Sequence, residues 1–497
     1  MTSNPIIAWF GPLKQLGQPR FRAQHPSLRY WTEHKEDLPR FVRQSPIAMR
    51  YLRLLGPLAW DQFPERCGRP NGNPHPIPHP AFAAACLVKL DQQLVSMGAL
   101  RQYLVEHPEL VWLFGFPLTP APASPWGFDA DASLPTQRHF TRLLRQFPNV
   151  ALQFLLDSSV ALLQAELAEE GIVLGECISM DTKHILAWVV ENNPKAYIKK
   201  GERFDKAKQP KGDPDCRLGC KRRHNQRASS KEPPPTPSAE PVPADTISVG
   251  EYYWGYASGV VATKIPGWGE FVLAELTQPF DRSDASYFFP LTAETERRLG
   301  VRPRFGAFDA AFDAFYVYEY FHQDGQEGFA AVPFSERGGH RRTFDEEGLP
   351  LCQAGLPMPL KYTFWSKTTL VEHECGRYVC PLLFPEKTDQ VCPIAHKRWP
   401  KGGCVTTMAT SIGARIRYQL DRESDAYKEV YKQRTATERI NSQAKDLGIE
   451  RPRLRNGQAI ANQNTLIYIL INLRTLHRVC HRKTQRRNPD EMTASAA

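Results

Sequence analysis

Residues 431–445 read YKQRTATERINSQAK and carry four polar side chains of different kinds: Tyr431, Arg434, Glu438 and Lys445. Their separations of 3, 4 and 7 residues keep side chains on one stripe of an α-helix. No Gly or Pro interrupts residues 427–447, so the sequence predicts one continuous helix, with Tyr427 and Asn441 extending the stripe.

A mixed polar stripe of this kind is most often the solvated face of a helix. Here, however, the carboxylate of Glu438 stands between the cations of Arg434 and Lys445. That order suits a carboxylate that holds a metal ion, with Arg and Lys holding the phosphates of a polyanionic substrate on either side. Both interpretations stay open from the stripe alone.

The pattern Y-x2-R-x3-E-x6-K resembles the signature of a large class of bacterial insertion-sequence transposases of the DDE superfamily, and every spacing matches. The resemblance implies that Glu438 is the third catalytic acid and that Tyr431, Arg434 and Lys445 contact DNA. It also requires two aspartates from the rest of the chain, each at the end of a strand.

Two stretches supply such aspartates. Residues 171–183, GIVLGECISMDTK, form a β-branched and apolar run that predicts a buried strand with Asp181 at its end. Residues 302–308 predict another strand, which delivers Asp309. FDAAFD, at residues 308–313, resembles the family's second-acid motif, except for Ala in place of the usual Gly. Asp313 is the alternative second acid, and Asp309 is favoured because it follows the strand directly.

The order of elements around these acids predicts the fold. Residues 252–263 and 270–278 read as an antiparallel pair of strands, and a short helix at residues 291–299 and a helix at residues 310–321 flank the strand before Asp309. An acid after the first and the fourth strand is the order of a ribonuclease H-like domain. We therefore expect an α/β protein with a ribonuclease H-like catalytic domain, a mixed sheet flanked by helices.

An all-helical N-terminal domain precedes this part. Its helix near residues 133–146 has Thr136 as a candidate N-cap and carries Arg138, Arg142 and Arg145, which suits DNA docking as well as a solvated basic face. The layout resembles the terminal-repeat-binding domain of the same transposases. The predicted boundaries are 1–168 (helical, DNA-binding), 169–324 (catalytic, first part), 325–413 (β-rich insertion), 414–480 (catalytic, second part) and 481–497 (polar, frayed tail).

Two segments inside these boundaries have special composition. Residues 200–248 are basic and then Pro-rich, which predicts a disordered loop within the catalytic domain. Residues 459–480 have a broad apolar face and are predicted to pack on the sheet as the last core helix.

The composition excludes several classes of protein. The chain has 497 residues, too many for one core, and a net charge of +10, which favours an anionic partner. The N-terminus lacks the pattern of a signal peptide, and no apolar run reaches about 18 residues, so we expect no membrane association. The expected location is the bacterial cytoplasm, at the nucleoid.

Eleven cysteines are expected to be reduced thiols or metal ligands in that compartment. Zinc is possible but not favoured at the C-x3-C-x3-H triplet that begins at Cys216. The same holds for a looser set in the insertion, formed by Cys375, Cys380, Cys392 and Cys404 together with His373 and His396.

Asp181, Asp309 and Glu438 would form an all-oxygen site that needs cations to relieve its charge repulsion. Oxygen ligands and a phosphate substrate point to Mg²⁺, with Mn²⁺ as a substitute, and two ions about 4 Å apart would assist an in-line displacement. In this interpretation Asp181 bridges both ions, while Asp309 and Glu438 each bind one.

The resemblance implies a DNA transposase that binds the terminal inverted repeats of its element as a dimer, nicks the double-stranded DNA and joins the ends to target DNA. It also implies a hairpin step in which an aromatic side chain holds a flipped base, with Trp365 and Trp399 as candidates. The alternative is a catalytically inactive, transposase-derived DNA-binding or regulatory protein. A ribonuclease H-like nuclease of another kind is a third possibility.

Overall fold

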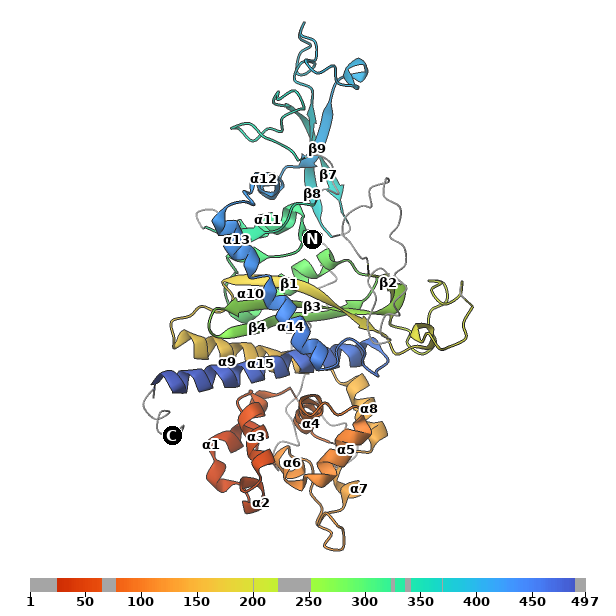
Figure 1. Cartoon of the computed structure of the whole chain (residues 1–497), viewed down its shortest axis with the longest axis vertical. Coiled ribbons are helices and arrows are strands. Elements are labelled where there is room, and N and C mark those ends of the chain that lie inside the picture. The colour runs from red at the N-terminus through yellow and green to blue at the C-terminus, as the bar shows by residue number, and fades with distance from the viewer. Residues whose placement is uncertain are drawn as a thin grey trace, which may run out of the picture.

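The fold is described from a computed structural model of the whole chain. The structure describes residues 25–64, 77–199, 201–221, 252–322, 327–335, 341–368 and 370–487. The chain is a mixed α/β protein, with a mixed sheet and its helices in the middle, a helical body at one end and a separate small sheet at the other (Figure 1).

The main sheet has six strands, and the longest of them, β3, lies next to three others. Neighbouring strands follow the order β4–β3–β1–β5–β6. The short strand β2 pairs with the first residues of β3, and β4 pairs with the rest of that strand. The pairs β1–β3 and β3–β4 are antiparallel, whereas β1–β5 and β5–β6 are parallel. The bounds are β1 Cys177–Leu186, β2 Arg217–Cys220, β3 Tyr252–Ile265, β4 Gly269–Pro279, β5 Phe305–Ala307 and β6 Phe329–Ala331.

The predicted antiparallel pair and the helix after it are confirmed. β3 and β4 are joined by a turn at Gly267, and α10 (Phe288–Leu299) ends at Gly300, whose φ of 71° is left-handed. Such a backbone conformation at a helix C-terminus favours glycine, because other residues are strained there. The helix expected at residues 310–321 is instead a 3-10 turn, Ala310–Phe312, followed by α11 (Phe315–Phe321).

Two long helices connect the sheet to the N-terminal part of the chain. α9 (Asn149–Ala168) and α15 (Gly457–Arg487) pack together, and α15 also covers β4 (Figure 1). Within the described residues, α9 alone is long and apolar enough to span a membrane by composition, yet it lies against α15, α10 and β4 as a core helix does.

Helix α15 differs in two ways from its prediction. It continues through residues 481–487, expected to be a frayed tail, because Lys483 is buried and pairs with Glu166 and Glu169 at 2.6 and 2.7 Å. It also buries asparagines that a purely apolar face would not carry. Asn472, for example, hydrogen-bonds both backbone groups of Val272 on β4, at 2.9 Å each.

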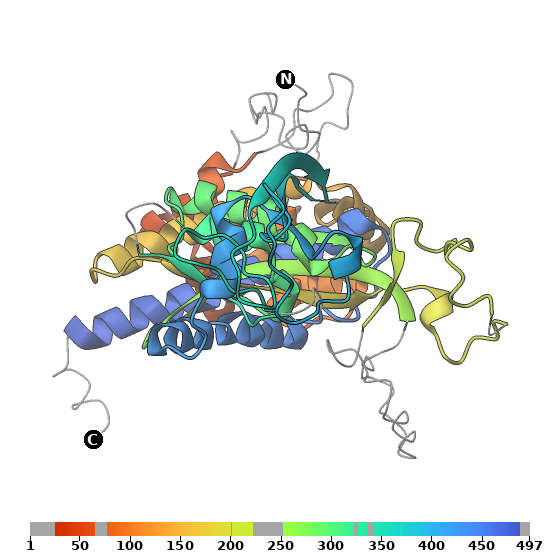
Figure 2. The same cartoon turned by 90° about the horizontal axis from the view of Figure 1, so that it is seen from above.

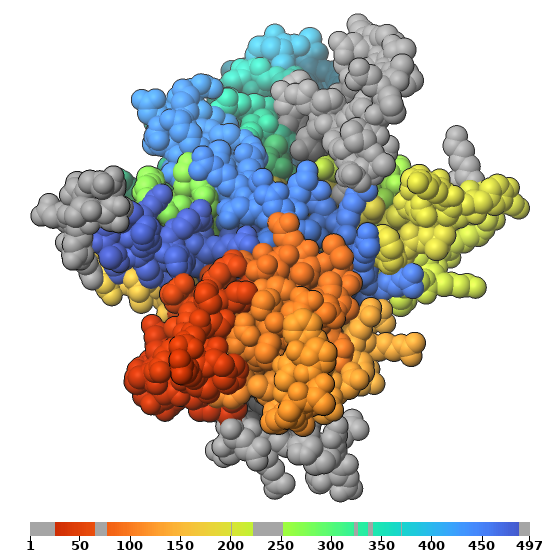
Figure 3. All heavy atoms as spheres, turned by 60° about the horizontal axis from the view of Figure 1, so that its bottom comes forward, coloured from red at the N-terminus to blue at the C-terminus, as the bar shows by residue number. Residues whose placement is uncertain are grey.

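The shorter helices α1 to α8 form a body on the far side of α15 from the sheet, seen as the red and orange surface in Figure 3. Thr136 caps α8 through the amide of His139, as predicted, and Pro108 begins α6. Arg138, Arg142 and Arg145 are exposed on α8. The bounds are α1 Leu28–Glu33, α2 Arg40–Arg43, α3 Pro46–Leu55, α4 His79–Asp91, α5 Met97–Glu106, α6 Pro108–Leu113, α7 Ala130–Ser133 and α8 Gln137–Gln146.

A second, antiparallel sheet of three strands lies apart from the main sheet. It is formed by β7 (Leu360–Lys367), β8 (Glu372–Val379) and β9 (Val405–Ala409), and it has its own small core around Met358, Tyr378 and Met408. β6 lies inside the predicted insertion range 325–413 but pairs with β5, so the separate sheet begins only after it.

The basic segment after β1 is more ordered than its composition suggested. Residues 201–221 of the loop predicted at 200–248 are described, and they include β2, which pairs with β3. The segment between β1 and β2 projects from one end of the sheet (Figure 1, Figure 2). The Pro-rich stretch 231–245 and His224 lie outside the described residues.

Candidate active site

Parallel strands β1 and β5 bring Asp181 and Asp309 together. Ser179 pairs with Ala307, and each aspartate comes two residues after its strand's member of that pair. The two side chains therefore leave neighbouring parallel strands at equivalent positions and on the same face. The sequence predicted Asp181 at the end of its strand, and this is wrong. β1 continues to Leu186 along β3 after its pairing with β5 has ended, so Asp181 lies in the middle of the strand.

Asp181 is held by hydrogen bonds to both carboxylate oxygens. The Thr182 amide donates to Oδ1 at 2.8 Å, and Asn441 Nδ2, from α14, donates to Oδ2 at 2.9 Å. Burial, together with the nearby carboxylates of Asp309 and Asp284, raises the pKa of Asp181 to about 6. These partners orient a carboxylate whose charge is poorly solvated.

Asp309 and Asp313, the two candidates for the second acid, have different surroundings. Asp309 Oδ1 accepts a hydrogen bond from the Ala311 amide at 2.8 Å, and its side chain lines the same cavity as Asp181. Asp313 is fully buried and pairs with Arg417 at 2.6 Å, with further hydrogen bonds from Tyr318 and Ser335. Asp313 is therefore part of a buried ion pair with Arg417, whereas Asp309 lines the cavity that Asp181 also lines.

The stripe at residues 431–445 lies on two helices, which corrects the prediction of a single one. α13 (Asp425–Lys432) and α14 (Thr435–Asp446) meet at Gln433 and Arg434. The hydroxyls of Thr435 and Thr437 donate to the carbonyls of Lys432 and Arg434 at 2.9 and 3.0 Å. Such side-chain bonds compete with the helical ladder, and the backbone tightens into i→i−3 bonds at this point.

The polar side chains of the stripe contact one another. Arg434 donates to Glu438 at 2.6 Å, and its guanidinium lies 5.8 Å from the ring centre of Tyr431. Tyr431 stacks on Tyr427 with ring centres 5.8 Å apart. Lys445, two turns after Glu438 on α14, lines the cavity together with Glu438 and Asn441.

One cavity of about 1230 Å³ gathers the three predicted acids. Asp181 comes from β1, Asp309 from the end of β5 and Glu438 from α14, so segments far apart in the sequence converge there. Arg434 does not line the cavity, although its charge acts on Asp181.

Three carboxylates that the sequence reasoning missed also line this cavity: Asp281, Glu450 and, next to Asp309, Asp284. Asp284 begins the 3-10 helix Asp284–Tyr287 after β4 and accepts a hydrogen bond from Thr182 Oγ1 at 2.7 Å. Burial and the neighbouring Asp309 raise the pKa of Asp284. The signal that could have found it is the one used for Asp309, an acid shortly after a predicted strand.

These residues fit a hard divalent cation by their chemistry. The carboxylates of Asp181, Asp284, Asp309 and Glu438, with others around the same polar cavity, form an oxygen donor set, which Mg²⁺ and Mn²⁺ prefer. Within the described part of the chain, no three His, Cys, Asp or Glu side chains already enclose a point where a metal ion would sit. Glu438 is paired with Arg434 instead, so holding a cation would require that carboxylate to exchange partners.

Of the other candidate ligands, Cys220 lines the cavity of the acids, whereas those of the small sheet and the two candidate aromatics do not. Cys375 Sγ is 3.3 Å from His373 Nε2 on β8, and Cys404 lies beside Cys380. Cys216 is buried, and its thiol donates to the Asp213 carbonyl. Trp365 is 76% exposed on β7, whereas Trp399 is half-buried.

A comparison with models of known protein families gives no match for this chain. A comparison with curated protein sequences gives none either.

Proposed function

We propose that this chain is a DNA transposase of the DDE superfamily, which binds the ends of its insertion sequence, cleaves the DNA and joins the ends to target DNA. The observation that carries the proposal is the convergence of Asp181, Asp309 and Glu438 on one cavity. The first two arise from neighbouring parallel strands and the third from the helix with the Y-R-E-K spacing.

The strand order supports a ribonuclease H-like core for this proposal. Numbered without β2, the five strands run in the order 3-2-1-4-5, with the first three antiparallel and the last two parallel to the first. This is the topology expected of such a core, and β2 is then an addition on its edge. The helices α1–α8, with three exposed arginines on α8, are the proposed terminal-repeat-binding part.

The proposed cofactor is Mg²⁺, with Mn²⁺ as a substitute, held by Asp181, Asp309 and Glu438. Two such ions would activate a water or 3′-hydroxyl and stabilise the leaving oxygen. The chain's own residues have separate tasks. Asn441 and the Thr182 amide orient Asp181, and Arg434 and Lys445 on either side of Glu438 hold phosphates of the DNA strand.

Tyr431 would hydrogen-bond or stack beside those phosphates, in line with its contact with Arg434. For a flipped base, Trp365 is the better of the two candidates, because its indole is far more exposed than that of Trp399. Zinc in the small sheet stays a prediction that is not favoured.

The alternative is an inactive, transposase-derived DNA-binding or regulatory protein. Nicking of a supercoiled plasmid distinguishes an active transposase from this inactive alternative. Sequencing the DNA that flanks the gene supplies the inverted repeats, and a plasmid that carries them is incubated with the chain and Mg²⁺. We expect nicks at the repeat ends that need the metal. Specific binding to the repeats without nicking, in both Mg²⁺ and Mn²⁺, would favour the alternative.

A further inference from the structure

The cavity that holds the acids extends well beyond them. Its floor follows β1 from Asp181 to His184, three residues that span about 10 Å in a strand. One wall follows α14 from Glu438 to Lys445, seven residues that also span about 10 Å. The two elements thus lead from an acidic end toward a second end of the same cavity.

That second end carries several lysines and one paired carboxylate, Glu450. The segment between β1 and β3 contributes Lys206 and Lys221, and α14 contributes Lys445. Neither Lys206 nor Lys221 has an ion-pair partner within the described residues. Lys183 of β1, which also lines the cavity, is paired with Glu450 at 2.5 Å. Unpaired ammonium groups in one concave wall attract an anion that extends along it.

His184 and Tyr252, next to these lysines, also suit contact with the sugar–phosphate backbone of a DNA strand. His184 Nδ1 is buried and has no hydrogen-bond partner among the described residues. Burial, with the charges of Lys221 and Lys183, lowers the pKa of His184 to about 4, so the imidazole is neutral at pH 7. Tyr252, exposed at the start of β3, adds a ring and a hydroxyl to the same rim.

We propose that residues 201–221 form the second half of a DNA-binding groove, in which Lys206 and Lys221 hold the sugar–phosphate backbone of the DNA strand that leaves the acids. This inference rests on the proposed function and extends it. It assigns a task to residues 201–221, whose composition alone indicated a disordered loop. The strand would pass from Arg434, near Asp181, across the acids and toward Lys445, Lys221 and Lys206.

The test measures how salt affects DNA binding by the full-length chain. A short fluorescein-labelled duplex of arbitrary sequence stands for target DNA, and its affinity is measured by anisotropy over a series of NaCl concentrations. We compare the wild type, Lys206→Ala/Lys221→Ala and Lys206→Arg/Lys221→Arg. The matched control is Lys208→Ala, since Lys208 belongs to the same segment but pairs with Glu202 at 2.8 Å and lines a different cavity from that of the acids.

Removing two phosphate contacts should lower the slope of log K against log salt by about 1.8. The arginine variant should keep the wild-type slope, and so should Lys208→Ala. An unchanged slope in the double alanine variant, or an equal loss in Lys208→Ala, would overturn the groove while the proposed function stands. If the wild type binds no DNA, the proposed function itself fails. Thermal unfolding of each variant shows whether a lost slope comes from a lost fold.

Discussion

At the residue scale, the site depends on how individual carboxylates are satisfied. Asp313 is neutralised by Arg417 in the interior, whereas the donors to Asp181 among the described residues are neutral: Asn441 and the Thr182 amide. A buried charge without a counter-ion is costly, and at functional sites that cost often marks a place for a cation. The contrast between two aspartates of the same chain therefore favours the proposal that Asp181 binds a metal ion.

Replacing Asp181 by Asn should abolish strand cleavage, because the amide cannot supply the negative oxygen that a divalent ion requires. DNA binding should stay within about twofold of the wild type, since Asp181 makes no phosphate contact in the proposed arrangement. Plasmid nicking and anisotropy measure the two effects side by side. Glu386→Gln, which changes an exposed carboxylate of the small-sheet region, is the matched control. Cleavage by Asp181→Asn at more than a trace rate would remove Asp181 from the site.

At the scale of the element, α13 and α14 show how a short interruption redirects a polar stripe. The break at Gln433 and Arg434 leaves Tyr431 stacked on Tyr427 in α13, while Glu438, Asn441 and Lys445 share the cavity-facing side of α14. Ala436, Ile440 and Ala444 are fully buried and fasten the opposite side of α14 to the core. A polar face turned to a cavity, with an apolar face packed on the sheet, is not a freely solvated helix.

Arg434→Ala and Lys445→Ala should each lower the salt slope of DNA binding by about 0.9, the loss expected for one phosphate contact. Each should also impair cleavage or strand transfer. Lys432→Ala is the control, because Lys432 is exposed on α13 and pairs with Glu429. Unchanged slopes combined with full activity would return the stripe to the interpretation of a solvated face.

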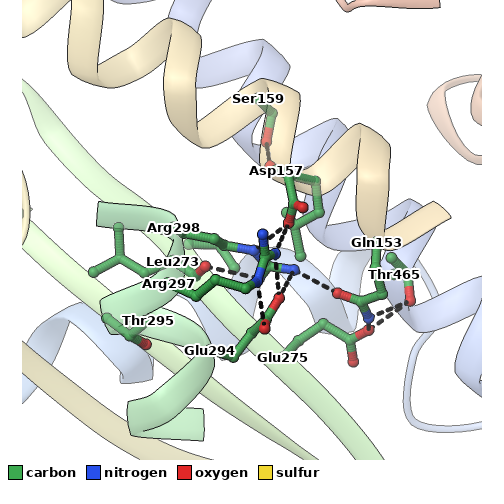
Figure 4. Close-up of polar contacts among 12 residues, drawn as sticks. Gln153, Asp157, Ser159, Leu273, Glu275, Glu294, Thr295, Arg297, Arg298 and Thr465 are labelled. Atoms are coloured by element: carbon green, nitrogen blue, oxygen red, sulfur yellow. Dashed lines mark hydrogen bonds and ion pairs between the residues drawn. The ribbon is translucent and has the colours of Figure 1, made fainter. Parts of the chain in front are cut away.

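At the scale of the whole molecule, a buried polar network joins four elements (Figure 4). Arg298 of α10 contacts Asp157 and Gln153 of α9 at 2.6 and 2.7 Å. Gln153 donates to Glu275 of β4 at 2.6 Å, and Thr465 of α15 donates to the same oxygen at 2.5 Å. The network fixes the two long helices to the sheet and therefore the N-terminal helices to the acids.

Glu275 makes the stability of this junction depend on pH. Burial raises the pKa of Glu275 to about 7, against 4.5 for the free side chain. The folded state therefore holds the proton more tightly, so this stabilisation is complete below pH 4.5 and is lost as the pH rises through 7. The loss corresponds to roughly 3 kcal/mol of unfolding free energy.

Glu275→Gln should remove that dependence, because the amide does not ionise. The unfolding free energy of the variant, relative to the wild type, should rise by roughly 3 kcal/mol between pH 4.5 and pH 8. Urea unfolding of both proteins across this range measures the difference. A constant difference over the whole range would show that Glu275 does not titrate in the folded chain.

Assembly is the remaining question at this scale. Joining two element ends in one event needs two active sites, and the chain offers one candidate triad. We expect a monomer without DNA, since a net charge of +10 opposes self-association, and two chains on two ends when end DNA neutralises that charge. Light scattering with and without end DNA measures the stoichiometry. A cleavage-competent complex of one chain on one end would contradict the paired-end arrangement.

The sequence by itself determined the features that depend on near neighbours. Thr136, Pro108 and Gly300 bound their helices because caps and φ preferences act within a few residues. Apolar patterning identified β3, β4 and α15, and the order of acid-bearing segments predicted the α/β class. The spacing from Tyr431 to Lys445 identified the polar stripe for the same local reason.

Only the tertiary structure decided which polar groups are buried and what they meet. Arg417 pairs with Asp313 from 104 positions away in the sequence, and Asn441 donates a hydrogen bond to Asp181 from 260 positions away. Asp284, β2 and the buried asparagines of α15 escaped notice because their partners lie on other elements. Local pattern carries no information about such long-range pairs, whose energies arise only when the sheet and its helices close around them.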